Sequence, residues 1–262
     1  MYIMIKFGPA GLGGVKEAEE NLKHFHQLGL TACEIAFTYG VYIKNKEDAV
    51  RIGKAAKKLG IQLSIHAPYW INLNSKEKRK IEESKKRILN CCEIGNFLGA
   101  DCVVFHPGYY GKMDKEETYE IIKNNIIDIQ KTIKQKKWKI KLAPETTGKL
   151  NVFGSINEIL RLVKETGCIF TLDFAHIYAR SNGKISYEEI YKPFSHFNSL
   201  HCHFSGIVFG LKGEKHHKIT PENELKKLLS ALPRNKDIVI INESPDPVGD
   251  SVKALKIWQN LH

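Results

Sequence analysis

The sequence lacks the features that would place it outside the soluble globular proteins. No apolar run approaches the roughly 18–20 residues that span a bilayer, and the first residues lack the basic stretch and long apolar core of a secretory leader. No low-complexity tract interrupts the chain. The six cysteines form no C-x-x-C pair and no disulfide-like framework. We therefore expect a soluble, cytoplasmic protein that does not act at a membrane.

Acidic residues are fewer than basic ones. The 262 residues include 40 Lys and Arg against 29 Asp and Glu, which gives a formal net charge of +11. An excess of positive charge attracts polyanions, so a nucleic acid or a phosphorylated substrate is one interpretation. A solvated, lysine-rich surface without such a partner is the other. The charge alone leaves both open.

Short apolar runs alternate with longer amphipathic segments along the whole chain. The amphipathic segments, such as 17–28, 47–59 and 75–98, have helical spacing of their apolar residues. Eight repeats of strand and helix predict an α/β protein, a single (β/α)8 TIM barrel over residues 1–262. The predicted strands are 2–7, 32–37, 62–67, 102–107, 139–145, 168–174, 199–204 and 237–243.

Glycines support this division of the chain. Several predicted helices finish on a glycine just before the next strand, and glycine tolerates the left-handed conformation that closes a helix. The order G-x-G-x-x-G of a doubly wound dinucleotide fold is absent after the first strand, where the chain has GPAGLGG. The barrel is therefore preferred to an open sheet. The predicted closing glycines are Gly29, Gly60, Gly99 and Gly167.

Histidines and carboxylates occupy the ends of six consecutive predicted strands. In a barrel, the carboxyl ends of the strands surround one pocket, where chemistry is built. A lone residue of this kind is more often a structural hydrogen-bonding group or a helix cap, but six in succession are not explained that way. The strand-end residues are His66, His106, Glu145, Asp173, His203 and Glu243, and nearby loops add His176, Glu214 and His216.

Divalent cations would relieve the repulsion among these clustered charges. Imidazole and carboxylate ligands without a thiolate favour zinc, with manganese or iron as alternatives. Nine candidates are too many for one tetrahedral ion, so we infer two or three ions that share a bridging carboxylate. Centres of this kind activate water in phosphate-ester hydrolysis.

The segments that carry these residues resemble endonuclease IV, the zinc-dependent apurinic/apyrimidinic-site endonuclease family of DNA base-excision repair, within the xylose-isomerase-like barrels. The resemblance implies a DNA phosphodiesterase that cuts 5′ to an abasic site in double-stranded DNA, and we expect it to act as a monomer. The matching segments are HAPYWINL (66–73), FHPG (105–108), PETTGK (144–149), LDFAH (172–176), HFSG (203–206), EKHH (214–217) and NESPD (242–246).

The resemblance also implies a role for each candidate ligand. Glu145 would bridge two zinc ions and orient the attacking water, which makes it the implied catalytic residue. His201 shares a strand face with His203, but the HFSG context favours His203 as the ligand. The implied ligand sets are His66, His106 and Glu145 for one zinc, Glu145, Asp173, His203 and Glu243 for the second, and His176, Glu214 and His216 for the third.

Two departures from the family pattern concern the third zinc and the substrate. The chain has Glu214 where the family usually has Asp, and segment 37–46 (FTYGVYIKNK) replaces a polar stretch that enters the DNA minor groove. In this segment Tyr39, Tyr42 and Lys44 are candidates for base stacking and phosphate contact, and packing against the barrel is the alternative. Tyr69 resembles a family tyrosine at the lesion, or is a rim aromatic.

Two other functions remain open. A sugar isomerase or epimerase of the same barrel superfamily also gathers Glu, Asp and His at strand ends around one or two ions, although carboxylates usually dominate such sites. A non-catalytic nucleic-acid-binding barrel that keeps its metals for structure is the third interpretation, which the full ligand set disfavours.

Overall fold

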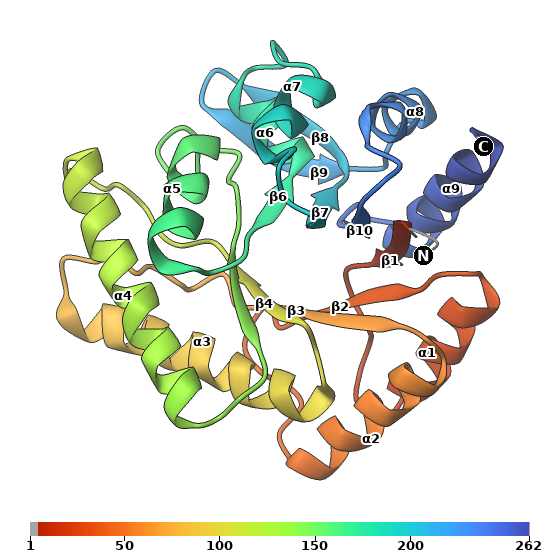
Figure 1. Ribbon diagram of the computed structural model, residues 1–262, viewed down its shortest axis with the longest axis horizontal. Helices are drawn as coiled ribbons and strands as arrows, with labels where there is room; N and C mark the ends of the chain where they lie inside the picture. Colours follow the sequence, from red (N-terminus) through yellow and green to blue (C-terminus); the bar gives the residue numbers. More distant parts are fainter. Residues whose placement is uncertain (1–4, 262) are drawn as a thin grey trace.

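Eight parallel strands form a closed barrel in the computed structural model, which describes residues 5–261. Each strand matches one predicted from the sequence, although residues 2–4 of the first predicted strand lie outside the described residues. Figure 1 shows the strands at the centre of the molecule and the helices around them. The barrel strands are β1 (Ile5–Pro9), β2 (Ala32–Ala36), β3 (Gln62–His66), β4 (Cys102–Phe105), β5 (Lys141–Pro144), β6 (Thr171–Asp173), β7 (Ser199–Phe204) and β10 (Asp237–Asn242).

The helices follow the predicted pattern. Helices α3 and α5 end at Gly99 and Gly167, whose φ values of 68° and 70° are left-handed as predicted. Within residues 5–261, no helix is both long and apolar enough to cross a membrane. The helices are α1 (Ala18–Gln27), α2 (Lys46–Lys58), α3 (Lys78–Leu98), α4 (Lys115–Gln135), α5 (Ile156–Thr166), α6 (Phe174–Arg180), α7 (Tyr187–Tyr191), α8 (Glu222–Ala231) and α9 (Pro247–Asn260), with a 3-10 turn at Lys192–Phe194.

Two half-sheets make up the barrel. One has the strand order β1-β10-β7-β6 and the other β2-β3-β4-β5, and the pairings within both are parallel. Two isolated parallel bridges join the halves, between Ala10 and Glu34 on one side and between Glu145 and Thr171 on the other. This closure confirms the predicted (β/α)8 barrel.

An antiparallel hairpin follows β7 and was not predicted. Its strands are β8 (Gly206–Gly210) and β9 (Gly213–Lys218), and the pairing shifts register between Val208 and Phe209. The hairpin packs on α6 and lies beside α6 and α7 in Figure 1. It carries Glu214 and its neighbouring histidines to the carboxyl end of the barrel.

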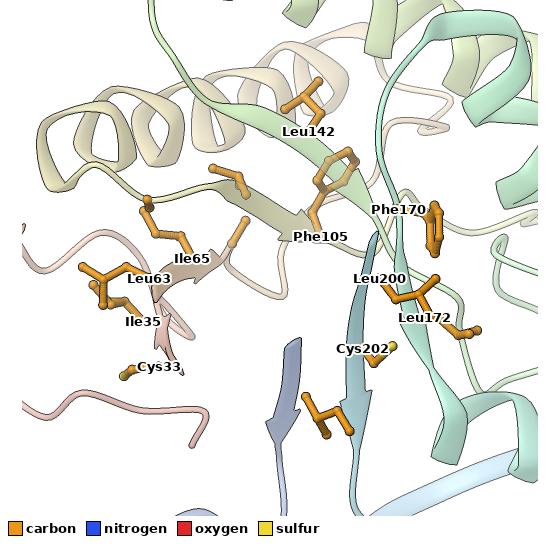
Figure 2. Close-up of a cluster of buried hydrophobic side chains, with 14 of the residues drawn as sticks. Cys33, Ile35, Leu63, Ile65, Phe105, Leu142, Phe170, Leu172, Leu200 and Cys202 are labelled. Atoms are coloured by element: carbon orange, nitrogen blue, oxygen red, sulfur yellow. The ribbon is translucent and has the colours of Figure 1, made fainter. Parts of the chain in front are cut away.

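Apolar side chains from the strands face the helices, and polar ones fill much of the barrel interior. Figure 2 shows the outward set on successive strands, including Ile35, Leu63 and Leu172. These residues belong to one buried cluster with apolar residues of the surrounding helices. The side chains between them in sequence point the other way, because alternate residues of a strand face opposite sides. Glu34 and Ser64 therefore lie inside the barrel, where both are buried.

Gly8 allows β1 and β2 to approach closely at one join between the half-sheets. A Cβ atom at this position would lie 1.8 Å from the carbonyl oxygen of Ala32. That oxygen belongs to the backbone of β2, so it cannot move without opening the barrel. The close approach positions the strand that carries Glu34.

We expect Gly8→Ala to destabilise the protein by about 1–3 kcal/mol or more, because the added methyl group overpacks against backbone. Gly95→Ala is the matched control. Its Cβ would meet the side-chain methyl groups of Ile65 and Ile140 at 3.1 Å, and alanine gains about 1 kcal/mol over glycine inside a helix. Urea unfolding of the two variants measures the difference, and equal midpoints would contradict the steric argument.

Candidate metal centre

The structure brings the predicted strand-end residues together at the carboxyl end of the barrel. Their ligand atoms form three neighbouring groups, and within each group the atoms lie within 4.8 Å of one another. Glu145 belongs to two of them, so it joins the first group to the second. The groups are His66, His106 and Glu145; Glu145, Asp173, His203 and Glu243; and His176, Glu214 and His217.

Glu145 is the hub of the centre. Its side chain is fully buried, and its two carboxylate oxygens face different histidines. Oε2 lies 3.2 Å from His66 Nε2 and 3.0 Å from His106 Nε2. Oε1 lies 3.1 Å from His203 Nδ1 and 3.4 Å from His176 Nδ1. One carboxylate therefore contacts histidines from four separate segments of the chain.

Asp173 and Glu243 complete the second group from opposite sides. Asp173 begins α6 as its N-cap, and its Oδ1 accepts a 2.6 Å hydrogen bond from the backbone N–H of His176. Its Oδ2 lies 3.4 Å from His176 Nδ1. Glu243 follows β10, and its Oε1 lies 3.4 Å from His203 Nδ1. The capping bond directs one oxygen of Asp173 to the helix and leaves the other for the centre.

The third group contains His217 where His216 was predicted, and this is a correction. His176 Nε2 lies 3.5 Å from Glu214 Oε2, and the rings of His176 and His217 are 5.5 Å apart. His216 is exposed. The cause is the register shift in the hairpin, where Val208 pairs with His216 but Phe209 pairs with Glu214. One extra residue lies between Glu214 and His216 and shifts the alternation of strand faces by one position. His217 therefore points to the same face of the hairpin as Glu214.

The protein orients several of these rings through their second nitrogen. His66 Nδ1 lies 2.8 Å from the carbonyl oxygen of Ala67, and His176 Nδ1 lies 3.0 Å from that of Thr146. A carbonyl oxygen only accepts, so both Nδ1 atoms carry the proton in these bonds, and Nε2 is the nitrogen that becomes an acceptor when the ring is neutral. Each Nε2 is the atom that faces a carboxylate of its own group. Histidine ligands of metals are held in this way.

The charges of the centre shift one another's pKa values. Burial alone would raise the pKa of Glu145, but His203 and His106 hold it well below its ordinary value. Burial would lower the pKa of His66, but Glu145 raises it to about 9. Burial and the neighbouring carboxylates raise the pKa of Asp173. Protons on the histidines therefore balance the carboxylates when no cation does so.

The donor set fits divalent cations such as zinc. Within the described residues, His106 Nε2 and Asp173 Oδ2 are buried without a hydrogen-bond partner, and both point into the groups. None of the three groups, as far as residues 5–261 extend, contains a cysteine. Imidazole nitrogens and carboxylate oxygens suit zinc, and manganese and iron accept them as well.

A cavity of about 190 Å³ leads to the centre, and it touches one residue of each group: His66, Glu243 and His217. Tyr69 also lines it, with its ring 6.2 Å from that of His66. Trp70, which the sequence analysis did not select, is 60% exposed beside it. The mouth of the site is therefore aromatic.

The three candidates in segment 37–46 are placed differently from one another. Tyr39 is 85% exposed. Tyr42 packs edge-on against Phe37 with the ring centroids 5.1 Å apart, and burial raises its pKa to about 12. Lys44 is exposed and donates to the carbonyl oxygen of Val41. Tyr39 and Lys44 are thus available to a ligand, whereas Tyr42 is held by the barrel.

A fourth group lies deeper in the barrel, and its carboxylate was not among the predicted ligands. Glu34 of β2 contacts His201 and His203 of β7, and all three are buried. A charged residue in the middle of the apolar run ACEIA was the available signal, because a buried carboxylate requires partners. The partners lie 167 residues or more further along the chain.

Comparison with known proteins identifies relatives of this chain. The model of the family described as xylose isomerase-like TIM barrel matches residues 22–261. An uncharacterized protein of Methanocaldococcus jannaschii is 38% identical over 278 residues, which cover 99% of this chain and 98% of that protein. A probable endonuclease 4 of Mycobacterium marinum is 24% identical over 208 residues, which cover 78% of this chain and 79% of that protein.

Solved structures share the barrel. SacUVDE has a TM-score of 0.78 at 16% identity, with 99% of each chain covered. Endonuclease IV from Thermus thermophilus has a TM-score of 0.70 at 20% identity, covering 98% of this chain and 99% of its own. D-psicose 3-epimerase from Clostridium cellulolyticum has 0.69 at 14% identity, covering 97% and 98%. At these identities the likeness shows the fold alone.

We expect His217→Ala to lower the zinc bound at saturation by about one ion per chain, because the third group loses a ligand. His216→Ala is the matched control, since that side chain is exposed on the other face of the same strand. Elemental analysis of both proteins after dialysis against zinc measures the difference. Loss of an ion in His216→Ala but not in His217→Ala would reverse the correction.

We also expect the metal-stripped protein to lose stability as the pH rises from about 6.5 to 9. His66 binds its proton more tightly when folded, with a pKa of about 9 against 6.5. Its contribution is therefore complete below 6.5 and is lost as the pH passes 9, a change of about 3 kcal/mol. Urea unfolding in the presence of a chelator measures it, and His66→Asn provides the control. A pH slope unchanged in that variant would contradict the assignment.

Proposed function

We propose that this chain, which belongs to the xylose isomerase-like TIM barrel family, is a metal-dependent phosphodiesterase that cuts DNA 5′ to an abasic site. The observation that carries the proposal is the arrangement of three ligand groups around one buried carboxylate, Glu145, beneath a single mouth. Relatives named as probable endonuclease 4 support it.

The number of ligand groups favours phosphoester hydrolysis over sugar chemistry. The three groups hold five histidines and four carboxylates. Sugar isomerases and epimerases of this superfamily usually hold one or two ions, mostly through carboxylates. A phosphodiester carries negative charge on its phosphate and gathers more on the leaving oxygen during hydrolysis. Several cations that share a carboxylate are suited to offset that charge.

Bound divalent ions supply Lewis-acid activation of water and stabilisation of phosphate charge. The residues of the chain hold the arrangement rigid. Glu145 stays anionic, because the surrounding histidines lower its pKa, and it lies where it can accept a proton from water. His66 and His176 are fixed by hydrogen bonds to backbone carbonyls, so their free nitrogens need no reorientation during reaction.

The rim of the site supports DNA as the substrate. Exposed aromatic residues occupy the loops that follow three neighbouring strands, β2, β3 and β4, and exposed lysines stand on loops at the same end. Aromatic rings stack on bases and lysines contact phosphates, which agrees with the net charge of +11. The aromatic residues are Tyr39, Tyr69, Trp70 and Tyr109, and the lysines are Lys44, Lys112, Lys149 and Lys212.

A sugar epimerase is the second candidate. The cavity at the mouth has a volume of about 190 Å³, which suits a ligand the size of a monosaccharide. D-psicose 3-epimerase is also among the structures with this fold. The two candidates differ in the group formed by His176, Glu214 and His217, which extends the centre beyond the ions that an epimerase uses.

The test is incision of a duplex oligonucleotide that carries one abasic site. We expect zinc-loaded protein to cut on the 5′ side of the lesion and chelator-treated protein to be inactive. Glu145→Gln should lose at least about 100-fold in rate, because removal of an outer-sphere partner alone costs 10–100-fold. Glu93→Gln, which changes an exposed side chain of α3, is the matched control. Cut ends resolved on a denaturing gel identify the bond.

No incision by zinc-loaded protein would reject the proposal. The same protein would then be assayed for interconversion of free ketoses, since the epimerase remains as the other candidate. Incision by Glu145→Gln at the native rate would still support the nuclease activity, but it would contradict the role proposed for Glu145.

A further inference from the structure

A buried polar group lies below the metal centre, and the proposed reaction does not use it. Glu34 from the middle of β2, Ser64 from β3 and His201 from β7 meet inside the barrel, and all are buried. Strands β2 and β3 belong to one half-sheet and β7 to the other. An ionised carboxylate in such a place costs several kcal/mol unless it is paired and hydrogen-bonded. The position of the group therefore requires an explanation.

Each oxygen of Glu34 has its own partners. Oε2 accepts a 2.7 Å hydrogen bond from the Ser64 hydroxyl and lies 3.2 Å from His201 Nε2. Oε1 lies 3.1 Å from His203 Nε2. These last two atoms are both buried, and neither makes a hydrogen bond in the described part of the chain, so this contact is an ion pair. Ser64 and His201 thus hold one oxygen, and the other is directed at His203.

His203 is turned the opposite way from other histidines of the centre. His66 and His176 hydrogen-bond a backbone carbonyl through Nδ1 and direct Nε2 to a carboxylate of the centre, and His176 Nδ1 also lies 3.4 Å from Glu145 Oε1 and from Asp173 Oδ2. His203 directs Nδ1 to the centre, 3.1 Å from Glu145 Oε1 and 3.4 Å from Glu243 Oε1. Its Nε2 faces Glu34 in place of a carbonyl. The nitrogen that His203 offers to the centre therefore depends on Glu34.

We propose that Glu34 is a positioning residue that keeps the proton of His203 on Nε2 and so leaves the Nδ1 lone pair for a cation held jointly with Glu145, Asp173 and Glu243. The inference rests on the proposed metal centre. A carboxylate that accepts from the outer nitrogen of a ligand histidine fixes the ring and makes its inner nitrogen a stronger donor. Ser64 and His201 act one step further away, because they hold Glu34 in place.

The same geometry admits an ion between Glu34, His201 and His203, whose ligand atoms lie within 4.8 Å of one another. Positioning is favoured for two reasons. Ser64 already donates to Oε2 of Glu34, the oxygen that faces His201, so an ion there would have to share that oxygen with the hydroxyl. A neutral imidazole has one lone pair in its plane for a metal, and His203 directs Nδ1 to Glu145. It therefore has none left for an ion at Nε2.

The test is the zinc affinity of Glu34→Gln, measured without DNA by competition with a chromophoric chelator. The amide can offer an N–H to His203, which favours the wrong tautomer. We expect affinity for the weakened site to fall 10–100-fold with the same number of ions bound at saturating zinc. Glu93→Gln on the surface is the matched control and should bind as wild type does. Ser64→Ala, a milder change, should weaken binding less than Glu34→Gln.

A spectroscopic measurement keeps the inference testable if Glu34→Gln folds poorly. In zinc-loaded protein labelled with 15N-histidine, we expect His203 to show a protonated Nε2 and a metallated Nδ1. Ser64→Ala should shift the Nε2–H signal of His203 and leave the Nδ1–H signal of His66 unchanged. A deprotonated Nε2 in the wild-type protein would overturn the inference.

Other outcomes separate this inference from the proposed function. Unchanged zinc affinity in folded Glu34→Gln would overturn the positioning role and leave the metal centre standing. Loss of one whole ion from both Glu34→Gln and His201→Gln would show that these residues bind metal themselves, which also overturns it. A wild-type protein that binds no zinc would instead reject the metal centre, and the positioning role with it.

Discussion

The structure depends on two carboxylates that are buried inside the barrel and matched by imidazoles. Glu34 and Glu145 are both inaccessible to solvent, and His203 stands between them, with Nε2 toward Glu34 and Nδ1 toward Glu145. A barrel interior is ordinarily filled by layers of branched apolar side chains. Here a polar column runs from His201 to the mouth, and removing any one partner would leave a charge uncompensated.

Closure of the barrel and assembly of this column are the same structural event. The two half-sheets are joined by backbone bridges at Ala10–Glu34 and Glu145–Thr171, so each buried carboxylate sits on a join. His203 comes from the half-sheet opposite to both of them. Glu145 contacts His66 and His106 within its own half-sheet, whereas Glu34 is paired across the join with His201 and His203. The contacts of His203 with Glu34 and Glu145 form only when the halves meet, which ties the geometry of the site to the fold.

The barrel does not by itself select a reaction. Structures named as an endonuclease and as a sugar epimerase share it with similar TM-scores, and function resides in the groups mounted on a fold. In this chain the distinctive additions lie outside the eight strands. The hairpin β8–β9 supplies Glu214 and His217 to the third group, and the loops after β2, β3 and β4 supply the exposed aromatic rim.

The sequence by itself determined the eight barrel strands, the helices between them and most of the strand-end residues, and the tertiary structure decided which of these residues meet. Strand periodicity and closing glycines such as Gly99 depend on local chemistry, so they were predictable. His217 was not, because a bulge in the hairpin changes which face a residue occupies without changing residue type. Tyr42 was selected for substrate contact, but Phe37 holds it against the barrel. The role of Glu34 is visible only from its contacts with His201 and His203. These two residues lie too far along the chain for a local sequence pattern to reveal the contacts.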